Sequence, residues 1–147
     1  MKVVIQVCSN ASVSVNNELI NKINEWYLLL VRIDKNDNED IIKKMANKIV
    51  NLRINKDEND KTNLSILTTG GEILSISQFT LCAMLDSRRP SFSFAASADI
   101  AKDLYHKFNK QLENYGIIVK EGVFGAEMDV ELLNKGPFTI VITEKDL

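Results

Sequence analysis

Two short polar stretches carry the residue types that could do chemistry in this 147-residue chain. The first, Ser77-Gln78-Phe79-Thr80-Leu81, closes the predicted strand EILSISQFTL. Its hydroxyl and amide groups can donate and accept hydrogen bonds, but serine and threonine are weak nucleophiles unless a base lies beside them. Taken alone, the stretch is equally an ordinary strand whose Ser and Thr side chains face solvent.

The second stretch is NKGPFTI, residues 134–140. Proline lacks a backbone donor and is tolerated at the start of a strand but not in its middle. Gly136-Pro137 therefore predicts a turn that opens a strand over residues 137–143. The same rigid pair could instead present main-chain carbonyl oxygens to a ligand, and the residues alone leave both interpretations open.

Most familiar catalytic sets are missing from the chain. Its one histidine, His106, lies two positions from both Leu104 and Phe108 on a predicted helix, so it points away from the apolar face. This placement argues against a Ser-His-Asp or Cys-His site. Cys8 and Cys82 form no CxxC pair, which predicts free buried thiols and no zinc site. With no glycine-rich phosphate loop either, we expect no metal and no cofactor.

Composition limits the remaining possibilities. Hydrophobic residues make up 45% and charged residues 26% of the chain, enough for one core and one domain over residues 1–147. The net charge of −2 gives no broad basic surface, so any nucleic acid would be contacted over a small patch. The apolar run at the N-terminus is too short for a signal peptide and alternates like a strand, which predicts a cytoplasmic protein.

The hydrophobic pattern predicts strands, a helix, a hairpin, a second helix and further strands. Asn16-Asn17 is a plausible hairpin turn after strands over 2–8 and 11–15, because asparagine tolerates positive φ. The run 26–33 is typical of a strand buried on both faces, and residues 41–54 have helical spacing, with Asp37 or Asn38 as a cap. Residues 55–63 are polar and predict a flexible loop.

Gly70-Gly71 predicts the turn of a second hairpin between NLSIL and EILSISQFTL. Ser97 begins and Gly116 ends the second helix. Its expected apolar face consists of Ile100, Ala101, Leu104, Tyr105, Phe108 and Leu112. Another strand is expected over 117–119, and the whole order indicates a mixed α/β (α+β) domain with a large sheet.

Both polar stretches resemble motifs of one family, the D-aminoacyl-tRNA deacylases, once called D-tyrosyl-tRNA deacylases. Residues 77–81 match the family's SQFTL motif. Asn134, Gly136, Pro137 and Thr139 match its N-x-G-P-x-T motif, with Phe138 where valine is commoner. The likeness extends along the whole chain, at VVIQ…ASVSV near the start, LRI at 52–54, RPSFS at 89–93 and FGAEM at 124–128.

The resemblance implies a curved, barrel-like, mainly antiparallel sheet with two main helices. It also implies hydrolysis of the ester between a D-amino acid and the 3′ terminal adenosine of tRNA, and of mischarged glycyl-tRNA. L-amino acids would be rejected by a Gly-cisPro loop. Family members are homodimers in which this loop enters the partner's site, and they need no cofactor. The resemblance implies catalytic roles for Ser77, Gln78, Phe79 and Thr80, and substrate binding by Gly136, Pro137, Met128, Phe124, Ala95 and Ala96.

The sequence departs from the family at three positions. Val7 stands where the family has an arginine that locks the Gly-Pro loop together with a methionine, matched here by Met128. Arg32 and Trp26 each replace a common glycine. One hypothesis is that Arg32 reaches the same loop and replaces the lost arginine; the alternative is an arginine at a strand end that extends to water.

Two other functions are compatible with these departures. A non-catalytic nucleic-acid-binding protein could retain the fold, and binding without turnover would identify it. A deacylase with relaxed chirality is also possible, although such relatives carry PQATL-like residues in place of SQFTL.

Overall fold

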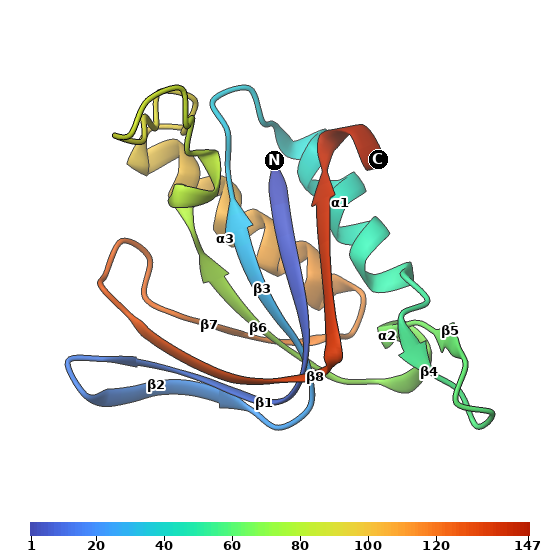
Figure 1. The fold of residues 1–147 in the computed structure, drawn as a ribbon. Coiled ribbons are helices and arrows are strands. Elements are labelled where there is room, and N and C mark those ends of the chain that lie inside the picture. The colour runs from blue at the N-terminus through green and yellow to red at the C-terminus, as the bar shows by residue number, and fades with distance from the viewer.

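The computed structural model describes all 147 residues as a mixed α/β fold around one strongly curved sheet (Figure 1). The strand order is β2-β1-β3-β6-β7, β8 pairs with β1 to complete the sheet, and β4 and β5 form a separate pair. In chain order the elements are β1 (Lys2–Val15), β2 (Glu18–Ile23), β3 (Trp26–Arg32), α1 (Glu39–Asn51), β4 (Asn55–Lys56), β5 (Thr62–Leu64), α2 (Ile66–Thr69), β6 (Glu72–Ser77), the 3₁₀ helix η1 (Phe79–Cys82), α3 (Ala98–Asn114), β7 (Ile118–Glu121), β8 (Asp129–Thr143) and the 3₁₀ helix η2 (Glu144–Asp146).

Strand β1 organises the sheet because it pairs with three other strands, all antiparallel. Its residues 2–8 pair with β3 and its residues 11–15 pair with β2, while β8 follows nearly its whole length. The single long strand replaces the two that the sequence predicts. The hairpin to β2 is confirmed: Asn16 and Asn17 both have positive φ, 51° and 64°.

The second predicted hairpin is wrong. Ser65 accepts a hydrogen bond from the Thr68 amide through its side chain, so the residues after it form the short helix α2 instead of a strand. Gly70, at φ 68°, ends that helix. Strand β6 then pairs in parallel with β3 on one side and β7 on the other. Part of the expected loop at 55–63 belongs to the hairpin of β4 and β5.

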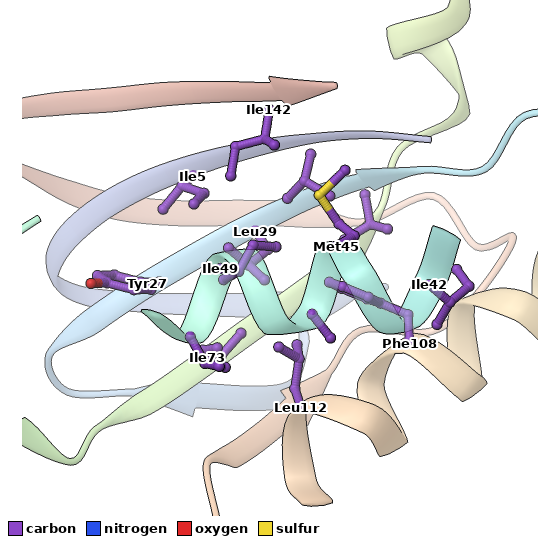
Figure 2. Close-up of a cluster of buried hydrophobic side chains, with 14 of the residues drawn as sticks. Ile5, Tyr27, Leu29, Ile42, Met45, Ile49, Ile73, Phe108, Leu112 and Ile142 are labelled. Atoms are coloured by element: carbon purple, nitrogen blue, oxygen red, sulfur yellow. The ribbon is translucent and has the colours of Figure 1, made fainter. Parts of the chain in front are cut away.

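Helices α1 and α3 pack on each other and cover one face of the sheet. Asn38 caps α1 by accepting from the Asp40 and Ile41 amides, which confirms one of the two predicted caps. Figure 2 shows α1 side chains lying between those of the sheet and those of α3. This core includes Ile5, Tyr27, Leu29, Ile42, Met45, Ile49, Ile73, Phe108, Leu112 and Ile142.

Helix α3 buries the predicted face except at its first turn, where Ile100 is 53% exposed because packing against the core begins one turn later. Both cysteines are free and buried, as predicted. No helix is long and apolar enough to cross a membrane.

Candidate active site

Strand β6 delivers the first motif to the end of the sheet. Ser77, its last residue, pairs with Val31 of β3, and the Gln78 amide donates to the Val31 carbonyl at 2.8 Å. The chain then turns into η1, so Phe79 and Thr80 are not strand residues as the sequence predicted. Their side chains leave the sheet and are exposed.

The 3₁₀ turn offers main-chain donors. Phe79 and Thr80 begin it, so their amides have no partner inside it. The Gln78 side-chain amide donates to the Thr80 hydroxyl oxygen, which fixes both side chains. Phe79 rests edge-on against Phe92, with 5.1 Å between ring centroids.

A pocket of about 450 Å³ opens beside this turn. Seven predicted site residues line it: Ser77, Gln78, Phe79, Ala95, Ala96, Phe124 and Met128. Thr80 lies next to it, held by Gln78. Sequence reasoning missed the other lining residues, although a cluster of small residues such as alanine and glycine leaves space for a pocket. They are Ile76, Ala98, Ala101, Gly125, Ala126 and Val130.

Gly122 lets Met128 reach the pocket, because a Cβ at position 122 would lie 2.6 Å from the methionine sulfur. No titratable side chain lines the pocket. Tyr105 packs against Phe124 behind it and donates to the Ser75 carbonyl at 2.8 Å; burial raises its pKa to about 12. The pocket can therefore hold an apolar or planar group beside main-chain amides but supplies no general base.

The histidine lies outside the pocket. His106 is about half exposed, and its Nδ1 lies 3.1 Å from a Glu121 carboxylate oxygen. This position on the outer face of α3 confirms the prediction from helical spacing.

Gly136 and Pro137 do not open a strand. They lie inside β8, where Thr139 pairs with Gln6 and Asn134 pairs with Cys8. Residues 135–138 thus bulge out opposite the single residue Val7, and a bulge is where a sheet tolerates proline. Gly136 has φ 120°, and the Gly136–Pro137 peptide bond is cis.

The motif residues around the bulge hold it in place. Asn134 accepts from the Phe138 amide at 2.9 Å and donates to Gln6 Oε1 at 2.5 Å and to Thr139 Oγ1 at 3.2 Å. The Thr139 hydroxyl also donates to Gln6 Oε1. Sequence reasoning missed Gln6, whose role appears only when β1 and β8 are paired.

The bulge and the pocket are far apart within one chain. Val130 lines the pocket while Gly136 does not, and roughly 20 Å of extended strand separates the two residues. Gly136 and Pro137 are exposed. The chain alone therefore assembles the first motif with Phe124, Met128, Ala95 and Ala96, but leaves out the second motif.

The hypothesis that Arg32 replaces the lost arginine at this loop is wrong within the chain. Arg32 is the last residue of β3 and pairs with Lys2, whereas Val7 pairs with Tyr27 near the start of β3. Its guanidinium donates to the Leu81 carbonyl at 3.2 Å and forms an ion pair with Asp34. Arg32 therefore supports the end of η1.

Trp26, like Val7, is a departure that lies near the loop. Its φ of 118° is one that side chains rarely adopt. Its indole fills the space beside Gly71, where a Cβ would lie 2.4 Å from the ring. Trp26 lines a second cavity together with Val7 and Gly136.

Comparison with known proteins agrees with this geometry. The family model described as D-Tyr-tRNA(Tyr) deacylase matches residues 4–143. A protein of Staphylococcus epidermidis named D-aminoacyl-tRNA deacylase is 48% identical over 99% of this chain and 97% of its own. One of Lactobacillus gasseri with the same name is 49% identical over 97% and 99%.

Two solved structures share the fold. The structure described as c-Myc DNA Unwinding Element Binding Protein is 36% identical, with a TM-score of 0.92 over 97% of this chain and 98% of that one. A probable eukaryotic D-amino acid tRNA deacylase has a TM-score of 0.83 over 96% and 97%, and at 15% identity it shows the fold alone.

Proposed function

The chain belongs to the D-Tyr-tRNA(Tyr) deacylase family, and from that premise we propose that it hydrolyses the ester of D-aminoacyl-tRNA and of mischarged glycyl-tRNA. Water adds to the ester carbonyl carbon, the bond to the ribose 3′ oxygen breaks, and that oxygen takes a proton. The products are tRNA and a free amino acid. The observation that carries this proposal is the pocket formed around Ser77, Gln78 and Phe79.

Stabilisation of the oxyanion supplies the catalysis in this proposal. An aminoacyl ester is already activated, and preorganised donors are worth most where water is excluded. The free amides of Phe79 and Thr80, with the Gln78 side chain, would hold the carbonyl oxygen. Thr80 then positions groups and does not attack, which fits the absence of a base in the lining. The substrate's own 2′-hydroxyl would help to activate the water.

Selection between D and L substrates would come from the bulge of a second copy. Its Gly136 and Pro137 carbonyl oxygens would accept hydrogen bonds from the substrate ammonium group, and an L side chain would collide with the loop. Glycine has no side chain to exclude and would pass. The exposure of both residues and the Asn134 network behind them support this role.

A homodimer would bring the two motifs together. Pocket and bulge lie apart in one chain, so a site that uses both needs two copies. Strand β8 pairs only with β1 and exposes Leu132, Leu133 and Val141. Apolar side chains along an edge strand suit contact with another copy.

The test is single-turnover hydrolysis of D-tyrosyl-, L-tyrosyl- and glycyl-tRNA, with Gly136→Ala beside the wild type. We expect the D and glycyl esters to be lost and the L ester to be spared. Gly136→Ala should be impaired, because φ 120° is strained for alanine and its Cβ would lie 3.2 Å from the Phe138 nitrogen.

Other results would replace the proposal. Loss of the L ester as well would indicate a filter loosened by Val7. Binding of tRNA without hydrolysis of any ester would indicate a nucleic-acid-binding protein, the function that one structural relative's name describes.

A further inference from the structure

A second cavity, of about 390 Å³, lies between the bulge of β8 and the β4–β5 hairpin. Figure 1 shows this hairpin beside the bend in β8. Its walls include Val7, Trp26, Asn55 and Gly136. None of its lining residues belongs to the pocket beside Phe79, so it is a separate site.

One hydrogen-bond donor of the cavity lining, on the Asn55 side chain, lacks a partner. The residue is only 5% exposed, and its Oδ1 accepts from the Tyr27 hydroxyl at 2.8 Å. Its Nδ2 is buried and has no hydrogen-bond partner. Because buried donors are nearly always satisfied, this amide points to an acceptor oxygen that a ligand would bring.

The rim of the cavity carries charges of both signs. Lys135 pairs with Glu25 at 2.6 Å and Lys56 pairs with Asp60 at 2.6 Å. All four side chains are exposed, so these ion pairs are weak and can exchange partners. The rim can therefore meet an ammonium group through Glu25 and a carboxylate through a lysine.

The remaining wall is apolar. Val7, Trp26, Ile54 and Phe138 are the apolar residues that line the cavity. Small-molecule sites combine such side chains with polar groups that fix the ligand's orientation, and here six of the ten lining residues are polar, charged or glycine. The space suits a ligand with one apolar side chain.

We propose that this cavity binds a free amino acid with an apolar side chain. Its carboxylate accepts from Asn55 Nδ2 and a rim lysine, its ammonium group faces Glu25, and its side chain packs against Trp26. The ligand would also contact Gly136, which belongs to the loop of the proposed chiral filter. A free amino acid is the product of the proposed reaction, but the binding itself does not depend on that reaction.

The intrinsic tryptophan fluorescence of the protein reports on this site, because Trp26, which lines the cavity, is the only tryptophan in the chain. The experiment titrates the wild-type protein with leucine and follows tryptophan fluorescence, without tRNA. Isocaproate, which lacks the ammonium group, and isoamylamine, which lacks the carboxylate, are titrated in parallel. We expect a saturable change with leucine, weaker binding of isocaproate and none of isoamylamine.

Asn55→Asp removes the free donor, places a negative charge beside the carboxylate and keeps an acceptor for Tyr27. It should weaken leucine binding by about tenfold or more, the effect of one hydrogen bond to a charged group. Asn59→Asp, the same change at an exposed position of the same hairpin, should bind like the wild type.

Three results would overturn the proposal: no saturable response to leucine, equal binding of isoamylamine, or unchanged binding by Asn55→Asp. The ligand series needs no variant, so it decides the matter even if Asn55→Asp folds poorly. Hydrolysis is measured separately with aminoacyl-tRNA, so failure here leaves the proposed activity untouched.

Discussion

At the scale of single residues, the Asn134 side chain makes three hydrogen bonds around the bulge. Its oxygen satisfies the Phe138 amide, and its nitrogen reaches Gln6 and Thr139. Asn134→Ala leaves the Phe138 amide without a partner, while Gln6 and Thr139 keep only the hydrogen bond between them. We expect a loss of about 1–3 kcal/mol in the free energy of unfolding and slower hydrolysis of the D ester.

Urea denaturation and single-turnover assays measure the two effects. Asn47→Ala is the matched control, because Asn47 donates to Tyr115 on the far surface of α1. The control should hydrolyse D-tyrosyl-tRNA normally. A normal rate and normal chirality in Asn134→Ala would show that the loop holds its shape without this side chain.

Cys8 and Tyr105 are two of the buried groups whose raised pKa makes stability depend on alkaline pH. Burial raises the pKa of the Cys8 thiol from 9.0 to about 11 and that of the Tyr105 phenol from 10.0 to about 12. The unfolded chain loses these protons first, so their contribution is fully present below pH 9 and is lost as pH rises toward 11 and 12.

Thermal melts from pH 8 upward should therefore show a falling Tm, with a shallower fall in Cys8→Ala. An equal slope in that variant would mean that Cys8 does not titrate differently on folding.

The free thiol of Cys8 should also resist alkylation in the folded protein at pH 8, since burial and a raised pKa both oppose formation of the thiolate.

At the scale of elements, α1 depends on its first turn. Asn38 accepts from two amides that would otherwise lack partners. Asn38→Ala should cost about 1 kcal/mol of stability, whereas Asn38→Asp should cost little because it keeps an acceptor. Denaturant titration of the three proteins checks this, and equal stability of the alanine and aspartate variants would contradict it.

The elements also show where sequence patterns succeed and fail. Helical periodicity predicted α1 and α3, and a continuous apolar run predicted β3, which is largely buried. It failed at residues 65–70, since the cap formed by Ser65 outweighs the strand preference of the surrounding residues. It also failed at Gly136-Pro137, because a bulge depends on the partner strand and leaves no local signal.

The candidate site was predictable only in part, for the same reason. Ser77, Gln78 and Phe79 adjoin one another in sequence, and a family motif identified them. Gln6 and three further alanines of the pocket, Ala98, Ala101 and Ala126, join their sites through long-range packing, which no single stretch reveals. The sequence misplaced Arg32 because the register between β3 and β1, which sets its neighbours, is not visible in either strand alone.

At the scale of the whole molecule, the proposed shared site can be tested by mixing variants. Gln78→Ala damages the pocket and Gly136→Ala damages the bulge. If each site combines one copy's pocket with its partner's bulge, a mixed dimer retains one intact site. Subunit exchange between two inactive variants should then restore roughly a quarter of the wild-type rate.

Each variant alone is the control, and sedimentation or light scattering verifies that both remain dimeric. A mixture with no more activity than its components would show that pocket and bulge act in the same chain or that no dimer forms. Leu133→Lys adds a charge to the exposed edge of β8. It should dissociate the dimer, and mixing variants that carry it should then restore no activity.

The contact between Trp26 and Gly71 restricts the order in which this sequence can evolve. The indole occupies the space that any side chain at position 71 would need. A lineage could acquire tryptophan at 26 only while position 71 was glycine, and afterwards position 71 cannot gain a side chain until Trp26 has been replaced. Descendants that keep Trp26, and with it the cavity wall that it forms, should therefore also keep Gly71.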